Sequence, residues 1–146
     1  MACLDSDIYA QAGFEPVWER VKSSVMCYQL GTGTAEVEVT KIYAEAAQFR
    51  GVNEAFTHYG GEFFAASSAD MRSITEKEEA IFRQMQERRF RVSTGDEFIS
   101  SLVFNTMKER IAPANEFVYR FWTGTYRCIS ESYKTTILCL HVPAEK

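Results

Sequence analysis

The two histidines are the first side chains to consider for chemistry, because imidazole serves both as a metal ligand and as an acid or base. His58 and His141 are widely separated, and neither lies in an HxH, HxxxH or HxxE pattern that would bring two metal ligands onto one face. The sequence therefore predicts no metal site, although two distant histidines and a cysteine could still meet in space.

Residue types suited to covalent or acid–base catalysis occur without the context that catalysis needs. A nucleophilic cysteine or serine requires a strained glycine turn and a partner base, and no such arrangement is found in the sequence. Cys128 and Cys139 fall in strand-like runs, where a cysteine usually behaves as a small buried hydrophobe. Glu76, Glu78 and Glu79 stand at a helix start, where carboxylates favour the helix dipole and stay solvated. We therefore predict no catalytic residue and a non-enzymatic role.

Phosphate and nucleic-acid sites are not indicated either. The turn Gly31-Thr32-Gly33-Thr34 lacks a third glycine and the P-loop lysine, so it is interpreted as a helix terminator, and the sequence identifies no cofactor. One basic cluster contains Arg83, Arg88, Arg89 and Arg91. Acids interleave with it, which is typical of a solvated, salt-bridged helix face and not of an RNA-binding surface.

Composition indicates one intracellular domain. The chain has 146 residues, 46% apolar and 14% aromatic, and 16 basic against 20 acidic residues give a net charge of −4. This balance does not favour nucleic acid or an anionic membrane. The four cysteines form no CxxC, the N-terminus is acidic where a signal peptide would be basic, and the longest apolar run, Ile137 to Leu140, is too short to cross a membrane. We expect an intracellular, cytoplasmic location.

The N-terminal region is expected to be a helix from about Glu15 to Leu30, followed by a break at Gly31-Thr32-Gly33. Apolar residues recur in it at spacings of three and four, which predicts one apolar stripe. The stripe can pack on its own domain or form a homodimer or partner interface through Val17, Trp18, Val21 and Val25.

The middle of the chain mixes strand and helix signals. Thr34 to Val39 alternates like a half-buried strand, although a helix through the whole stretch is an alternative, and Gly60-Gly61 is interpreted as a corner. Thr75 and Thr94 each begin a sequence that fits a helical capping box. The second helix should carry a full apolar face and end at Pro113.

Strand-like runs dominate the last third of the chain, from Phe117 to Trp122 and from Tyr133 to Val142. We therefore expect a single α+β domain with helices packed on an antiparallel sheet and strands at the C-terminus. Within it, residues 1–33 would form an N-terminal helix with its flank and residues 34–146 the core.

Two segments resemble the PAS family of sensory domains. The string from Val52 to Phe56, with Tyr59-Gly60-Gly61-Glu62, is similar to the segment in which a PAS strand ends in "VNxAF" and enters a short helix. The residues from Glu116 to Arg120, with those from Gly124 to Arg127, resemble the hairpin that carries "DGxYRW". The resemblance implies a sensory or dimerising module with a pocket between sheet and helices, and without the cysteine motif of light-sensing flavin members.

These observations favour a ligand-binding or protein-interaction module. Its pocket, for a small apolar ligand, would be lined by Trp122, Tyr126, Cys128, Ile137 and Cys139. One alternative is an enzyme or binding protein with the cone-shaped fold of nuclear transport factor 2, which a buried ionisable residue would support. Another is a helical scaffold protein.

Overall fold

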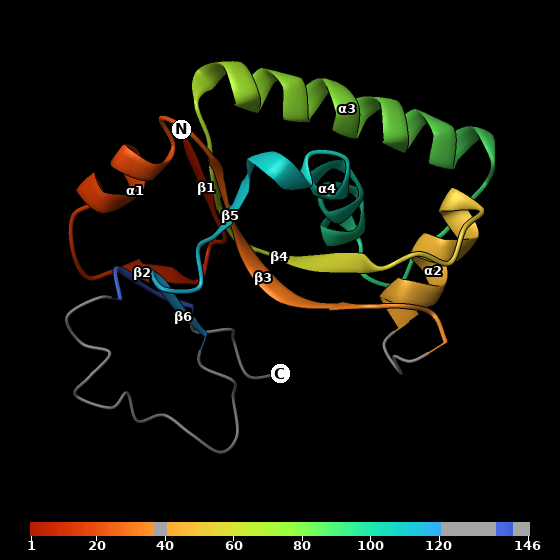
Figure 1. Cartoon of the computed structure of the whole chain (residues 1–146), viewed down its shortest axis with the longest axis horizontal. Coiled ribbons are helices and arrows are strands. Elements are labelled where there is room, and N and C mark those ends of the chain that lie inside the picture. Colours follow the sequence, from red (N-terminus) through yellow and green to blue (C-terminus); the bar gives the residue numbers. More distant parts are fainter. Residues whose placement is uncertain (37–40, 121–136, 142–146) are drawn as a thin grey trace.

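The structure is a computed structural model that describes residues 1–36, 41–120 and 137–141. The helices are α1 (Glu15–Arg20), α2 (Lys41–Arg50), α3 (Ser68–Glu87), α4 (Asp96–Asn105) and the short 3-10 helix η1 (Lys108–Arg110). The strands are β1 (Ala2–Leu4), β2 (Ile8–Ala10), β3 (Val25–Gly33), β4 (Phe56–Ala65), β5 (Ile111–Pro113), β6 (Val118–Arg120) and β7 (Cys139–His141). The expected single α+β domain with strands near its C-terminus is confirmed (Figure 1).

Two small sheets organise the described strands. The first has the order β1-β4-β3-β5, antiparallel except for the parallel pair β3–β5. The second has the order β2-β7-β6, in which β2 runs antiparallel to β7 and β6 runs parallel to it. Because β1 and β2 follow each other directly, the turn between them joins the two sheets.

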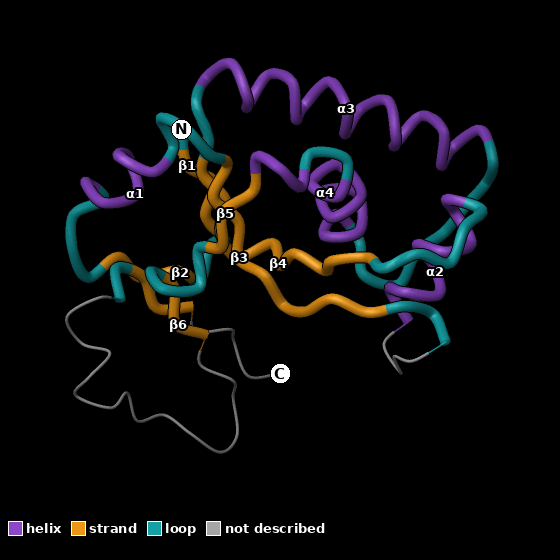
Figure 2. Tube along the Cα trace, viewed as in Figure 1, coloured by secondary structure: helices purple, strands orange, loops and turns teal. Residues whose placement is uncertain are grey.

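The helices cover the first sheet from different sides. Figures 1 and 2 show α3 lying over α4, α4 lying between α3 and the β3–β4 ribbon, and α1 and α2 at opposite ends of the molecule. In β3, Val25 and Cys27 pack in the core beneath α3 and α4, whereas Met26 packs in the core beside α1. A strand buried on both faces is expected to be continuously apolar, as this segment is.

A row of polar side chains on α4 forms hydrogen bonds with backbone groups along the edge of β4 that faces away from β3. Strand β1 pairs with β4 only at residues 63–65, so the earlier part of this edge has no strand beside it in the described part of the chain. Asn105 bonds both the N–H and the carbonyl of Thr57, at 3.0 and 2.7 Å, and Ser101 does the same for Tyr59, at 3.0 and 3.1 Å. Glu97, one turn earlier, accepts from the N–H of Gly61 at 3.3 Å. The i, i+4 spacing places all three on one side of the helix.

The expected N-terminal helix is much shorter than its sequence pattern indicated. Helix α1 ends at Arg20, and Val25 begins β3. Val17 and Val21 pack in the chain's own core, and Val25 lies in a strand, so the four-residue spacing spans two different elements. The prediction of a helix to Leu30 was wrong because pairing of β3 with β4 and β5 outweighs local periodicity.

Both predicted capping boxes were also misplaced. Helix α3 begins at Ser68, capped by Ser67, whose hydroxyl accepts from the N–H of Asp70 at 3.1 Å. Helix α4 is preceded by Gly95 with φ +64° and has no side-chain cap, and it ends at Asn105, well before Pro113. Its apolar face is nevertheless buried as expected, with Phe98, Leu102, Val103 and Phe104 in the core.

Two further expectations differ from the structure. Thr34 lies beyond the end of β3, residues 35–36 form a turn, and residues 37–39 lie outside the described residues. Gly60-Gly61 is no corner, because β4 runs through it from Phe56 to Ala65. The pairing register with β3 shifts there, since Gln29 lies opposite Tyr59 and Cys27 opposite Phe64. The glycines therefore mark an irregularity within one strand.

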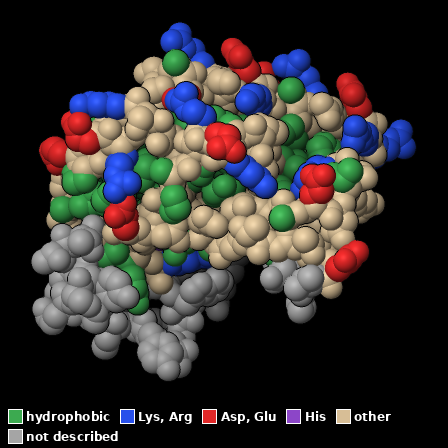
Figure 3. Space-filling model, in the orientation of Figure 1, with side chains coloured by type: hydrophobic (Ala, Val, Ile, Leu, Met, Phe, Trp, Pro, Cys, Tyr) green, Lys and Arg blue, Asp and Glu red, His purple; other side chains and the backbone are tan. Residues whose placement is uncertain are grey.

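The outer surface of α3 carries charges of both signs, as the sequence indicated. Figure 3 shows lysine, arginine and acidic side chains along the edge where α3 lies, with hydrophobic side chains gathered below it. Arg83 pairs with Glu79 at 2.9 Å, and Arg88 lies over the ring of Phe49. Among the described residues, no helix combines the length and the apolar character that crossing a membrane requires.

Candidate functional site

A groove beside α3 is the first candidate site, and we call it the acidic groove. One part has a volume of about 380 Å³ and is lined by Phe64, Glu78, Glu79, Phe82, Asp96, Ile99 and Ser100. A second part, of about 270 Å³, is lined by Cys3, Leu4, Asp5, Gly61, Phe64, Asp96 and Glu97. The two parts adjoin at Phe64 and Asp96, which line both, and together they extend from α3 and α4 to the start of the chain.

Helical spacing explains why these residues meet. Glu78, Glu79 and Phe82 share one side of α3, and Asp96, Ile99 and Ser100 share one side of α4. The hydroxyl of Ser100 donates to Glu78 Oε1 at 2.7 Å and joins the two helices across the groove.

The groove combines negative charge with apolar side chains. Five carboxylates line it, and none of the described residues in its lining is a lysine or an arginine. The hydrogen bond from His58, whose Nε2 lies 3.1 Å from Glu97 Oε2, lowers the pKa of Glu97, and the N–H of Gly61 adds to this effect. Glu97 therefore stays ionised to lower pH than an ordinary glutamate.

On another side of α3 the charge is reversed. Hollows of about 380 and 340 Å³ share Ile81 and Thr106, and the charged residues in their described lining are Arg50, Lys108, Lys77 and one acid, Glu54. These hollows and the acidic groove therefore carry charge of opposite sign on different sides of α3.

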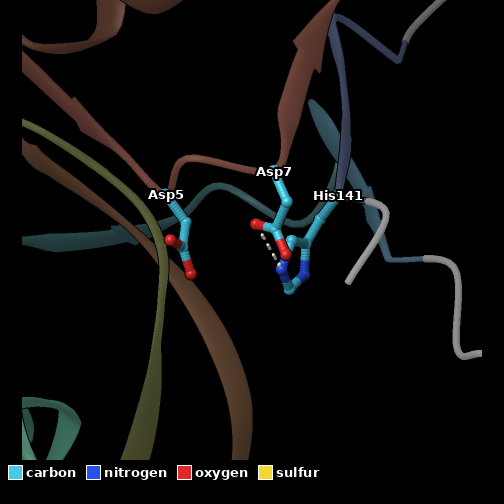
Figure 4. Close-up of side chains that lie close together, drawn as sticks. All are labelled: Asp5, Asp7 and His141. Carbon is cyan, nitrogen blue, oxygen red and sulfur yellow. Dashed lines mark ion pairs between the residues drawn. The ribbon is translucent and has the colours of Figure 1, made fainter. Parts of the chain in front are cut away.

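A buried polar cluster at the junction of the two sheets is the second candidate site. Glu62 on β4 is 2% exposed, and its Oε1 lies 2.9 Å from Arg120 Nε and 3.7 Å from His141 Nδ1. His141 is also buried, and its Nε2 lies 3.1 Å from Asp7 Oδ1. Figure 4 shows Asp5 and Asp7 on the turn after β1, with the carboxylate of Asp7 directed at the ring of His141.

Gly60 makes room for the buried carboxylate. A Cβ atom on Gly60 would collide with Oε2 of Glu62, so the side chain of Glu62 lies back over this glycine. Burial, and after it the charge of Glu62, raises the pKa of Tyr28, which places the hydroxyl of this β3 residue in the electrostatic field of the cluster. Buried charges of this kind concentrate at functional sites, although structural ion pairs produce them as well.

Only two of the five residues predicted to line the ligand pocket are among the described residues. Trp122, Tyr126 and Cys128 lie outside the described residues. Ile137 and Cys139 are buried, and Cys139 packs in the core beside α1. Burial raises the pKa of the Cys139 thiol, which disfavours the nucleophilic thiolate.

The predicted interface residues are placed differently from one another. Val17, Val21 and Val25 are buried within the chain, and Trp18 is 41% exposed. Three of the four residues therefore pack within the chain's own domain, which was one of the two alternatives that the sequence left open. Only Trp18 remains accessible to a second copy.

Sequence reasoning missed both candidate sites. The cluster joins segments around residues 7, 62, 120 and 141, and no local pattern relates them. One signal was present, however: Glu62 stands between Gly60-Gly61 and Phe63-Phe64, and an acid inside a strand-like apolar run is unusual.

Comparison with known proteins identifies no relative. No family model, curated protein or solved structure matches the chain significantly. Function is therefore inferred from the geometry of the two sites. The PAS resemblance stays a prediction, and in the structure its first string, from Val52 to Phe56, leads into strand β4.

Proposed function

We propose that this chain is a non-enzymatic interaction module that binds a basic, partly apolar segment of a partner protein in the acidic groove. The observation that carries the proposal is the lining of the groove, where the described residues include five carboxylates and several apolar side chains but no lysine or arginine. Complementary charge steers a cationic partner to such a surface and selects it over others.

Exposed apolar side chains supply the second half of the argument. Phe82 is 50% exposed and Leu4 43%, and each lies in one part of the groove. Aromatic side chains at a docking surface bind apolar groups and, through their ring faces, ammonium and guanidinium groups. A segment that combines lysine or arginine with leucine-type residues fits both features.

The location expected from the sequence accords with this proposal. Cys3, Cys27 and Cys139 are free thiols among the described residues, as a reducing intracellular compartment would keep them. We keep the cytoplasm as the proposed location.

A second candidate function has one specific observation in its favour. A buried ionisable residue was expected to support the alternative fold of nuclear transport factor 2, and Glu62 and His141 are ionisable and buried. In an enzyme or binding protein of that type, these buried residues would contact a small polar ligand at the polar cluster. The acidic groove is preferred because it is open to a partner.

Fluorescence anisotropy with a labelled amphipathic peptide of lysine and leucine tests the proposal. We expect saturable binding that weakens as ionic strength rises, because surface charges are screened by salt. Phe82→Ala and Asp96→Asn should each raise Kd about fivefold to tenfold.

Matched variants on α1 provide the control. Trp18→Ala and Glu19→Gln remove the same kinds of group from exposed positions outside the groove, and they should leave Kd unchanged. Equal effects of the groove and α1 variants would show that the peptide binds by general charge attraction and would overturn the proposal.

A further inference from the structure

Three side chains of the polar cluster are close enough to share one ion. Asp5, Asp7 and His141 each offer a ligand atom, and these atoms all lie within 4.8 Å of one another (Figure 4). The three ligands of a zinc ion bound at about 2.0–2.2 Å lie about 3.3 Å apart in tetrahedral geometry. The pair Asp7 Oδ1 and His141 Nε2, at 3.1 Å, is already near this spacing. Asp5 is exposed, so its side chain can rotate to complete the set, at the expense of the hydrogen bond that its Oδ1 accepts from the N–H of Ser6 at 2.7 Å.

The surroundings of His141 call for a positive charge. Carboxylate oxygens face both ring nitrogens, Asp7 at Nε2 and Glu62 at Nδ1. A histidine that binds a metal is neutral, and a neutral imidazole has one N–H and one lone pair, so in that form one of these carboxylates faces a lone pair. Asp7 Oδ1 is buried and forms no hydrogen bond with any described residue, although it lies 3.1 Å from Nε2. A cation that accepts lone pairs from both atoms removes this conflict.

Glu62 is placed as a support for a metal-bound histidine. Histidine ligands commonly donate their second ring N–H to a carboxylate, which fixes the tautomer and turns the other nitrogen toward the metal. Glu62 Oε1 lies 3.7 Å from Nδ1, and that nitrogen is buried without a hydrogen-bond partner among the described residues. Arg120 holds the same oxygen at 2.9 Å. A small shift of the His141 ring would form the Nδ1–H bond and leave Nε2 for the ion.

The charges of the cluster fit a divalent ion. Asp5, Asp7 and Glu62 contribute three negative charges and Arg120 one positive charge, which leaves an excess of two negative charges among these groups. An imidazole ligand favours zinc and its neighbours over magnesium and calcium, which prefer oxygen alone.

We propose that Asp5, Asp7 and His141 bind a zinc ion, with Glu62 orienting His141 and Arg120 orienting Glu62. Three protein ligands leave a fourth position of the ion to water or to a ligand. The site ties the turn between β1 and β2 to β7, so binding should also stabilise the junction of the two sheets. This inference does not rest on the proposed function, although Asp5 is also one of the carboxylates that line the acidic groove.

Isothermal titration of the full chain with zinc chloride tests the proposal. We expect one ion per chain, and Kd should rise at least about tenfold in Asp5→Asn and in Asp7→Asn, since each loses an anionic ligand. Asp5 is exposed, so its variant keeps the fold, which circular dichroism verifies. Zinc should raise the melting temperature of the wild type and have little effect on that of the two variants.

Two controls exclude other zinc-binding groups. Cys3 is exposed and near Asp5, so Cys3→Ser must bind zinc like the wild type, and Glu19→Gln removes an exposed carboxylate elsewhere. With cobalt(II) in place of zinc, the absorption spectrum should show the d–d bands of a cobalt ion with a low coordination number. It should show no charge-transfer band from a thiolate ligand. Absence of saturable binding up to about 1 mM zinc, unchanged binding in both aspartate variants, or loss of binding in Cys3→Ser would overturn the proposal.

Discussion

At the scale of single residues, the placement of the buried Glu62 side chain depends strictly on its neighbours. Burying a carboxylate has a large desolvation cost that a well-placed partner has to offset, and Glu62 is paired with Arg120 at 2.9 Å. Its position also depends on Gly60, where a side chain would occupy the space of Oε2. The need for glycine here is steric, since a Cβ atom would push a buried charge from its partner.

Substitution at the two adjacent glycines should therefore have different effects. Gly60→Ala should lower the free energy of unfolding by about 2–4 kcal/mol, because Glu62 must leave its pair with Arg120. In Gly61→Ala the new Cβ would approach only the partly exposed Glu97 side chain, at 3.3 Å from Cγ, so we expect a change within about 1 kcal/mol. Urea denaturation of both variants provides the measurement. A Gly60 variant as stable as the Gly61 variant would show that Glu62 moves freely.

At the scale of elements, the contact between α4 and β4 is polar as well as apolar. The helix buries Phe98 and Leu102 in the core, and its polar row serves the backbone of the strand. Ser101 is fully buried, and its hydroxyl bonds both the N–H and the carbonyl of Tyr59. The helix thus takes the place of a further strand along this part of the edge.

Ser101→Ala tests this role. It should lower the free energy of unfolding by about 1–3 kcal/mol, because the Tyr59 N–H and carbonyl would be left buried without a partner. The neighbouring Ser100→Ala loses a hydrogen bond with Glu78 in a partly open position and should cost under about 1 kcal/mol. Thermal or urea denaturation distinguishes the two variants. Equal losses in the free energy of unfolding would mean that water bonds to the backbone N–H and carbonyl of Tyr59 in Ser101→Ala.

At the scale of the whole molecule, the N-terminal stripe bears on the oligomeric state. Val17 and Val21 hold α1 on the sheet, and Phe14 lies between Trp18 and Phe63, with ring centroids 5.9 and 6.4 Å away. A homodimer through this stripe would have to rely on Trp18, which is too small a patch for a stable interface.

We therefore expect wild type and Trp18→Glu to sediment alike, as monomers. The substitution places a charge at an exposed position, so it should not disturb the core. Sedimentation velocity over a range of concentrations is the measurement. A dimeric wild type that Trp18→Glu dissociates would restore the homodimer predicted from the sequence.

Local patterns alone identified the α+β class and the apolar face of α4. Phe98, Leu102 and Val103 follow helical spacing and are buried, because a helix with such a stripe has to cover it. The same reasoning failed between Val17 and Val25, where helical spacing continues across a turn into a strand. Pairing of β3 with β4 and β5 decides that segment, and its partners are distant in the chain.

Only the tertiary structure determined the two candidate sites. Asp7, Glu62, Arg120 and His141 come from four separate segments, which strand pairing and the turn between β1 and β2 bring together. The acidic groove likewise forms only when α3 lies over α4. A sequence pattern reports the preferences of neighbouring residues, whereas a binding site depends on which distant segments pack together, and the free energy of that packing is shared by the whole chain.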